Sequence, residues 1–432
     1  MTNQELSVPA IKVQGTAYEV RWDEGVMVRF ERLYTHRDYQ VDAEIVVTDN
    51  AELAPHLLGP VRTSITRTWR NVITELERVS DRADWRQRLT QATILVLERH
   101  RRGAPVVALG SMDSPSPPVE QIPGLTWFGV PILIYGEGGI GKSSLCLALA
   151  SAIHTGRSIG GMTARQSNVL YLDWEASDTL TYWRTKQILD GQGIEGGEWP
   201  DPERPDSGRT GMVFYRYMSG SLVDSAEFLK GEISRLNIGT VCIDSAGPAT
   251  GGEPESAEAT LRMFEALRGM GEPDRPLTSL VLAHVSHEGR RAGRGQKSPF
   301  GSVFWLNLPR SCYELEASRS GNTAEFAVHH RKSNLGPLLA PRGIRMTWTH
   351  EGGVEVEGFD IKSNAELVEG LPLAERVGMV LRTEGGMSTA DISERMDTPP
   401  RTVSTTLSRH DGFRSKNGLW ETTEPLGTGD DD

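Results

Sequence analysis

The stretch ILIYGEGGIGKSSLCLALASAIHTG, Ile132 to Gly156, decides the fold of this chain. Its centre matches the pattern G-x-x-x-x-G-K-[ST], in which consecutive backbone N–H groups curl around a phosphate. An apolar run over residues 130–135 predicts a strand before this loop, and residues 142–154 predict a helix after it. Because strand, loop and helix agree, the sequence predicts a phosphate-binding loop rather than an ordinary glycine-rich turn.

The residues of the loop divide into a backbone cradle and two side-chain contacts. We expect Lys142 to reach the β- and γ-phosphate oxygens and Ser143 to bind Mg²⁺, so ATP and Mg²⁺ are the expected ligands. The expected nucleotide contacts are Gly136, Gly138, Gly139, Ile140, Gly141, Lys142, Ser143 and Ser144.

The composition sets limits on the class of protein. The chain has 432 residues and a net charge of −12, which is enough length for several domains and argues against a protein that coats nucleic acid with its whole surface. Local basic patches remain possible. No apolar run of about 18 residues and no signal-peptide pattern occurs, so we expect a soluble cytoplasmic protein with no membrane partner. The cysteines lack metal-ligand spacing and are predicted to be reduced core thiols: Cys146, Cys242 and Cys312.

The pattern along the chain predicts an α/β protein with flanking domains. Alternating strand patterns followed by charged helical patterns predict a small β-rich domain of unknown role at the N-terminus. Strands that alternate with helices predict a mostly parallel sheet around the phosphate loop. The expected segments are the N-terminal domain (1–109), a Ser- and Pro-rich linker (110–124), the ATPase core (125–360), a helical C-terminal domain (371–424) and a disordered acidic tail (425–432).

Two acidic residues are expected to complete the nucleotide site. The apolar run IGTVCID ends in Asp244, which would hold the water shell of Mg²⁺ at the edge of the sheet. Many P-loop ATPases place the water-activating Glu directly after this Asp, but here the next residue is Ser245. Glu175, at the end of the strand pattern NVLYLDWE, is therefore predicted to orient and deprotonate the attacking water. Asp173 is the competitor, set deeper in that strand.

A base at the end of the following strand resembles the RecA-like ATPase superfamily. The segments VLAHVSH, from Val281, and FAVHHRKSNLG, from Phe326, resemble more narrowly the branch of RepA-type hexameric replicative helicases and their phage and plasmid relatives, over residues 125–340. The resemblance implies that His284 senses the γ-phosphate. It also implies that Arg310, Arg331 or Lys332 reaches the nucleotide of a neighbouring subunit. Relatives often carry Lys where this chain has His287, which puts a phosphate role there in doubt.

The segment SHEGRRAGRGQKSP, between His284 and Phe300, is glycine-rich and basic. Flexible basic loops suit contacts with a nucleic-acid backbone, and in a ring this one would line the central channel and bind single-stranded DNA. An ordinary solvated surface loop is the alternative. The cations that would make the contact are Arg290, Arg291, Arg294 and Lys297.

Three helix patterns and an Asn-Gly hairpin after Leu371 resemble a winged helix-turn-helix domain. The third helix, 401–409, would enter the major groove of duplex DNA, with Arg414 and Lys416 on the wing near phosphates. Arg401 and Arg409 are the expected contacts on that helix. Many such domains instead bind proteins, so this alternative stays open.

These patterns favour one function over its rivals. A GTPase would need an Asn/Thr-Lys-x-Asp run and an ABC-type ATPase a Leu-Ser-Gly-Gly signature, and the chain has neither. A small-molecule kinase has little use for a winged helix. We expect an ATP-hydrolysing motor that acts on nucleic acid, a hexameric DNA helicase. The alternative is an ATP-switched DNA-binding loader, recombination mediator or regulator that does not unwind DNA.

Overall fold

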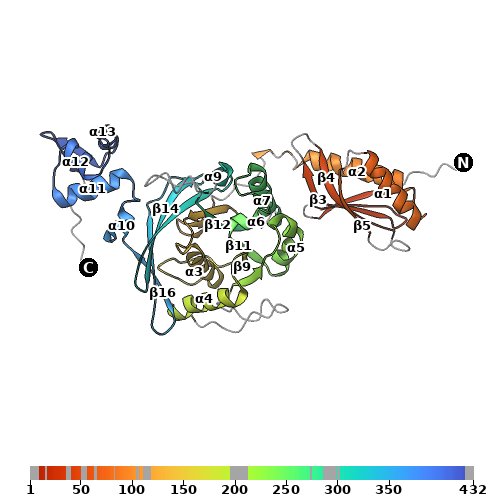
Figure 1. Cartoon of the computed structure of the whole chain (residues 1–432), viewed down its shortest axis with the longest axis horizontal. Coiled ribbons are helices and arrows are strands. Elements are labelled where there is room, and N and C mark those ends of the chain that lie inside the picture. The colour runs from red at the N-terminus through yellow and green to blue at the C-terminus, as the bar shows by residue number, and fades with distance from the viewer. Residues whose placement is uncertain are drawn as a thin grey trace. The chain divides into compact units, whose positions relative to one another are not determined.

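A computed structural model describes the chain (Figure 1). The described residues are 9–14, 17–35, 40–49, 56–62, 66–81, 83–103, 106, 108–109, 118–194, 213–272, 275–285, 299 and 302–423. The chain divides into two compact units. The first comprises residues 1–119, 220–237 and 262–277, and the second comprises the remainder. Across the described residues, no helix combines the length and apolar character needed to cross a membrane.

The first unit contains an antiparallel sheet covered by two helices. In β4 the residues alternate between buried and partly buried, because one face of the sheet packs and the other does not. Trp85 and Leu89 of α2 pack with Phe30 and Ile45 of the sheet. The sheet, in spatial order, is β1 (Ala10–Gln14), β2 (Ala17–Arg21), β3 (Met27–Thr35), β4 (Val41–Thr48) and β5 (His56–Arg62). The helices of this unit are α1 (Thr66–Val79), α2 (Trp85–Arg102), α5 (Leu222–Arg235) and the second half of α7 (Ala257–Met270).

The second unit is built on a nine-stranded sheet in the order β10-β9-β11-β12-β8-β13-β14-β15-β16. The pairs from β10 to β13 are parallel, and those from β13 to β16 are antiparallel. The strands are β8 (Pro131–Gly136), β9 (Asn168–Asp173), β10 (Phe214–Tyr217), β11 (Ile238–Asp244), β12 (Thr278–His284), β13 (Ser311–Ser320), β14 (Thr323–Ser333), β15 (Arg342–Trp348) and β16 (Val354–Phe359). The helices are α3 (Lys142–Thr155), α4 (Asp178–Gly191), α6 (Ala246–Ala249), the first part of α7, and α9 (Phe304–Asn307).

The core of the second unit is made by α3 against the parallel strands. The run Ile132 to Tyr135 is buried throughout because both faces of β8 are covered. Gly156 ends α3 at φ 66°, a left-handed conformation that glycine adopts without steric cost. The cysteines are free and buried, one each on α3, β11 and β13, as the sequence predicted: Cys146, Cys242 and Cys312.

The predicted linker 110–124 is wrong at its C-terminal end. Its last five residues include β6 (Glu120–Ile122), which pairs with β7 (Thr126–Trp127). Ile122 is buried in the core, and the Gln121 side chain donates hydrogen bonds to the hydroxyl oxygens of Ser167 (3.0 Å) and Thr240 (2.8 Å). The Pro-rich composition concealed a short strand, Glu-Gln-Ile, whose last two residues are buried, so the core begins at Glu120. Residues 110–117 lie outside the described part of the chain.

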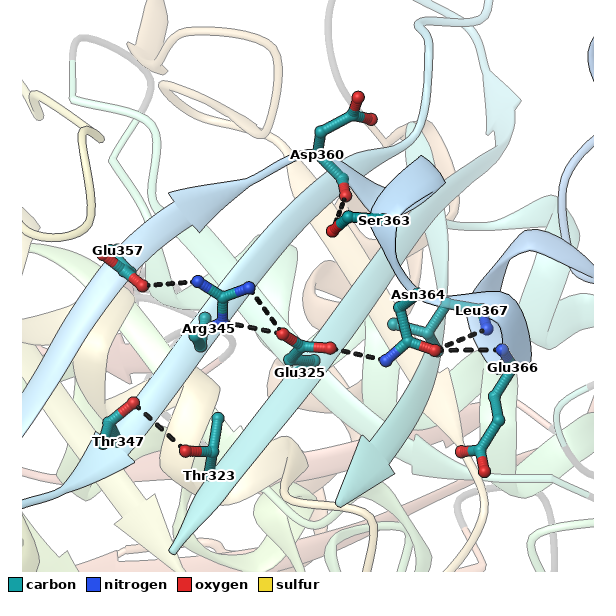
Figure 2. A network of polar contacts seen from close by, with 10 residues as sticks. All are labelled: Thr323, Glu325, Arg345, Thr347, Glu357, Asp360, Ser363, Asn364, Glu366 and Leu367. Carbon is teal, nitrogen blue, oxygen red and sulfur yellow. Dashed lines mark hydrogen bonds and ion pairs between the residues drawn. The ribbon is translucent and has the colours of Figure 1, made fainter. Parts of the chain in front are cut away.

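The segment that leaves the sheet is fastened to it by a polar network (Figure 2). Arg345 of β15 donates to the carboxylates of Glu325 on β14 and Glu357 on β16, at 2.7 Å each. The Asn364 amide nitrogen donates to the other oxygen of Glu325. The Asn364 side-chain oxygen then accepts from the backbone N–H of Glu366 at 3.0 Å and so caps α10 (Ala365–Val368), which follows the 3-10 turn η2 (Ile361–Ser363).

The C-terminal region has three helices and a hairpin around a small apolar core. Ser388 and Asp391 form a capping box at the start of the second helix. Asn417 and Gly418 both have positive φ, as a two-residue hairpin turn requires. The elements are α11 (Leu373–Glu384), α12 (Thr389–Arg395), α13 (Pro400–Arg409), β17 (Phe413–Lys416) and β18 (Leu419–Thr422). The predicted fold class is confirmed in its architecture: an α/β core with a mostly parallel sheet, an N-terminal β-rich domain and a C-terminal region of three helices and a hairpin. The acidic tail lies outside the described residues.

Candidate active site

Three of the predicted catalytic residues, Lys142, His284 and Glu175, meet at the carboxyl edge of the parallel strands. β12 lies between the phosphate-loop strand β8 and the strand β11, and His284 at its end is level with Gly136. Asp244 at the end of β11 is level with Asp173 at the end of β9. Because parallel strands present their carboxyl ends at one edge, the loop, His284 and the acidic residues converge there.

The phosphate loop has the backbone that an anion cradle requires. Gly141 has φ 110°, and a Cβ at this position would come within 2.8 Å of the Phe326 ring, so only glycine fits. A Cβ on Gly139, at φ 74°, would meet no atom within 4 Å, so space for a ligand lies beside the loop there. The Lys142 ammonium group is buried within the loop and donates to the carbonyl oxygens of Gly136 (3.1 Å) and Glu137 (2.7 Å).

A chain of polar contacts connects the loop lysine to the predicted base. The Lys142 ammonium nitrogen lies 3.3 Å from Nδ1 of His284, and Nε2 of that ring lies 3.7 Å from Oε1 of Glu175. The Ser245 hydroxyl group donates to the same Glu175 oxygen at 2.5 Å. The His284 ring, with help from Ser245 and Lys142, lowers the pKa of Glu175 to about 2. Glu175 is therefore ionised at neutral pH and half-exposed, as a residue that contacts a water must be.

Asp173, the alternative candidate for the base, already accepts hydrogen bonds from backbone N–H groups and a hydroxyl group. It is buried, and its Oδ1 accepts the N–H groups of Glu175 (2.8 Å) and Ala176 (2.9 Å). Its Oδ2 accepts the hydroxyl group of Thr181 at 3.0 Å. With both oxygens occupied, Asp173 positions the turn that carries Glu175.

Asp244 and Ser143 have the chemistry and proximity of a magnesium site. The Tyr171 hydroxyl group donates to Oδ2 of Asp244 at 2.6 Å. Burial raises the pKa of Asp244, and the nearby hydroxyl groups of Tyr171 and Ser143 oppose the rise. A hydroxyl and a carboxylate oxygen are the hard ligands that Mg²⁺ prefers, and it keeps several waters besides. The donor set therefore fits Mg²⁺, which would be held between the two.

The cations that were expected to reach a neighbouring subunit lie at the opposite edge of the sheet. Arg310 precedes β13, is exposed, and donates its backbone N–H to Pro131 O, at the start of β8. Arg331 instead donates to the buried Glu314 carboxylate at 2.8 Å. The Lys332 ammonium group donates to two backbone carbonyl oxygens, of Asn307 (3.1 Å) and Pro309 (2.6 Å), at the C-terminal end of α9.

Three residues at the site have roles that were not predicted from the sequence. They are Ser245, which contacts the base; Tyr171, which holds Asp244; and Arg319, whose guanidinium group donates to Gly139 O at 3.0 Å. The Gly-Asn pair at residues 321–322 was a signal for a hairpin beside Arg319. It could not indicate which loop that hairpin would approach.

The third helix of the C-terminal region presents a polar face. Val403 and Leu407 are buried in the small core, whereas Arg401 and Arg409 on α13 are exposed, as is Lys416 on the hairpin. Further exposed polar groups on α13 are Thr402, Ser404, Thr405 and Ser408. The basic segment with Arg290, Arg291, Arg294 and Lys297, together with His287, lies outside the described residues.

Comparisons with known proteins assign families to two parts of the chain. Residues 97–290 match the AAA domain family, and residues 365–409 match Sigma-70, region 4. No curated protein matches the chain. One similar solved structure is a KaiC-like protein from the hyperthermophilic archaeon Pyrococcus horikoshii, with 15% identity and a TM-score of 0.38, over 56% of this chain and 99% of that one.

The AAA match and the phosphate loop support an ATPase, and the loop lies in the parallel part of the nine-stranded sheet. The Sigma-70 region 4 match spans α10 to α13 and so ends with the helix that exposes Arg401 and Arg409. The C-terminal region therefore resembles that family over α10 to α13, with α12 and α13 in a helix-turn-helix arrangement. The hairpin β17–β18 lies beyond the matched residues.

Proposed function

We propose that the chain is an ATP-driven motor that acts on DNA, assembled as a homohexameric ring with helicase activity. The single observation that carries the proposal is the contact chain from Lys142 through His284 to Glu175 at the edge of the sheet, in a polypeptide that also carries a helix-turn-helix. The first part supports ATP hydrolysis, and the second supports coupling of that hydrolysis to DNA.

The proposed hydrolysis begins with the nucleotide phosphates in the amide cradle of residues 136–144. Lys142 exchanges its loop carbonyl partners for phosphate oxygens. Glu175 orients and deprotonates a water for in-line attack on the γ-phosphorus, and the ADP oxygen leaves. Mg²⁺, held by Ser143 and Asp244, would neutralise charge on the phosphates.

His284 is well situated to report the state of the phosphate. Its ring lies between Lys142 and Glu175, so a γ-phosphate that draws the lysine or the glutamate away also changes the surroundings of the ring. β12 ends at His284, and the basic segment 286–298 follows shortly after it in the sequence; we propose that this segment binds single-stranded DNA. In this proposal, a change at His284 on hydrolysis is transmitted along the chain to the DNA-binding segment.

We assign the transition-state cation to Arg310 of an adjacent subunit. Among the described residues, its guanidinium group makes no hydrogen bond or ion pair, whereas Arg331 and Lys332 are held within their own chain. Arg310 also lies at the opposite end of β8 from its own phosphate loop. A ring in which subunits associate head to tail would bring it to a neighbouring loop.

A second candidate function is an ATP-switched DNA-binding protein that does not unwind DNA. The exposed polar face of α13 favours it, because a helix-turn-helix binds the major groove of a duplex rather than a single strand. In this case nucleotide binding would control the affinity of the C-terminal region for duplex DNA.

Strand displacement on a forked duplex separates the two functions. A helicase releases the labelled strand only with Mg-ATP, and Glu175→Gln abolishes the release. ATP turnover that rises with single-stranded DNA but never displaces a strand would exclude the helicase and favour the switch. The assay should be paired with the mass of the assembly in a non-hydrolysable ATP analogue, since a strictly monomeric active protein would exclude the ring.

A further inference from the structure

We propose that Arg319 is a positioning residue of the phosphate loop: it holds one peptide of the loop so that its N–H faces the nucleotide phosphates. This inference rests on the proposed ATPase function and concerns the same site. Arg319 is exposed near the end of β13, and its guanidinium group donates to Gly139 O at 3.0 Å. Among the described residues, it has no carboxylate partner that would compete for it.

The geometry of the peptide bond gives this contact its consequence. The Gly139–Ile140 bond is trans, so its C=O and its N–H point in opposite directions. A carbonyl drawn outward to Arg319 leaves the Ile140 N–H directed away from Arg319. Ile140 is the fifth residue of the loop pattern, where an amide is needed for the anion cradle. The contact therefore pre-organises a donor that would otherwise have to be reoriented when nucleotide binds.

The hairpin that carries Arg319 is packed against the loop and hydrogen-bonded at its tip. Phe326 of β14 is fully buried and lies directly beneath Gly141. The tip of the hairpin is pinned to the end of β15, because the Asn322 amide donates to Trp348 O at 2.7 Å and the Trp348 N–H donates to Asn322 O at 2.9 Å. A guanidinium group offered from such a support loses little freedom when it binds the loop.

The direction of approach separates Arg319 from the hydrolytic residues. In the sheet, β13 flanks β8 on one side, whereas β12 and β11, which carry His284 and Asp244, lie on the other. Arg319 therefore acts on the cradle from the side away from the water-activating group. Its contribution applies equally to every nucleotide whose β-phosphate occupies the cradle, with or without a γ-phosphate.

The test measures the Kd of the full chain for a non-hydrolysable Mg-ATP analogue and for Mg-ADP. We expect Arg319→Met to raise both Kd values by the same factor, about tenfold, from loss of a charge-assisted hydrogen bond. At saturating ATP the kcat should not change, because binding is lost uniformly. Arg319→Lys, which retains a charged donor, should recover most of the affinity. Arg157→Met removes an exposed cation elsewhere in the same unit and serves as the control.

The possible results distinguish failure of the positioning role of Arg319 from failure of the proposed ATPase function. Unchanged Kd values in Arg319→Met, or a loss confined to the ATP analogue, would overturn the positioning role while leaving the ATPase intact. A loss that Arg319→Lys does not restore would also overturn it, because a charged donor would then not be the cause. Wild-type protein that binds neither nucleotide would overturn the proposed ATPase function itself.

Discussion

The two ends of the parallel strands carry charged side chains in opposite circumstances. At the carboxyl end, Lys142, His284 and Glu175 contact one another and leave the glutamate half-exposed. At the amino end, Arg331 and Lys332 are held by a buried carboxylate and by backbone carbonyls of their own chain. A cation that lies where a contact with a neighbouring nucleotide was expected need not be able to make that contact. Its existing hydrogen-bond and ion-pair partners decide whether it is available. Of the three cations at this end, Arg310 is the one whose side chain makes no hydrogen bond or ion pair among the described residues.

The largest expected effect tests whether Arg310, at the amino end of the strands in one subunit, completes the nucleotide site at the carboxyl end in its neighbour. Arg310→Ala should lower kcat by about 10³- to 10⁵-fold, the effect of removing an arginine finger. Lys142→Ala should abolish turnover and weaken nucleotide binding. The measurement is steady-state ATPase activity of each variant and of a 1:1 mixture.

Mixing the two inactive variants is the decisive control. If Arg310 acts in trans, random mixed rings restore about a quarter of the sites, in which one subunit supplies Lys142 and its neighbour supplies Arg310. If the mixture stays inactive although mixed oligomers form, Arg310 does not complete a neighbouring site.

The next effect concerns the base at the carboxyl end. Glu175→Gln should lower kcat by about 10²- to 10⁴-fold, because general-base catalysis is lost while the shape of the side chain is kept. The Kd for Mg-ATP should be retained, as measured by fluorescence or calorimetry. Asp173→Asn should instead lower stability, since Asp173 holds backbone N–H groups. Normal hydrolysis by Glu175→Gln would assign the base elsewhere.

A third effect tests the claim that Arg331 is structural. Arg331→Met leaves the Glu314 carboxylate buried without its partner, and we expect a loss of about 3–5 kcal/mol in the free energy of unfolding. Denaturant unfolding measures it. The double variant Glu314→Leu with Arg331→Met should recover most of the loss, because no buried charge then remains unpaired. A stable Arg331→Met protein with impaired ATPase activity would favour the trans role instead.

The smallest effect is a pH dependence of stability at the carboxyl end. The pKa of Glu175 is lowered to about 2 in the folded chain, against about 4.3 when unfolded. Its ionised form therefore stabilises the fold above about pH 4.3, and this contribution is lost as the pH falls toward 2. The Tm difference between wild type and Glu175→Gln should shrink between pH 5 and pH 3. A difference that is constant over this range would contradict the lowered pKa.

The sequence predicted the parallel-sheet core and its phosphate loop because their signals are local. The glycines around Lys142 and the apolar run before Asp244 each define a strand end, and parallel topology brings those ends together. Arg319 and Tyr171 could not be found in this way, because each acts across strands that are distant in the chain. The partners of Arg331 and Lys332 likewise depend on the register of β13 with β14 and on where α9 ends.

The linker shows why composition alone did not predict the strand β6. A run of Ser and Pro predicts a connection by composition, but burial of Ile122 is decided by the surface that it meets. The alternation Glu-Gln-Ile at the end of that run is too short to signal a strand on its own.

The three buried thiols provide an intrinsic label for the ATPase core. Cys146, Cys242 and Cys312 lie on α3, β11 and β13, and no other cysteine occurs in the chain. A thiol-reactive dye added to the native protein can therefore react only when this core opens, whatever the flanking domains do. The labelling rate with and without Mg-ATP would measure how strongly nucleotide closes the core, without any engineered probe.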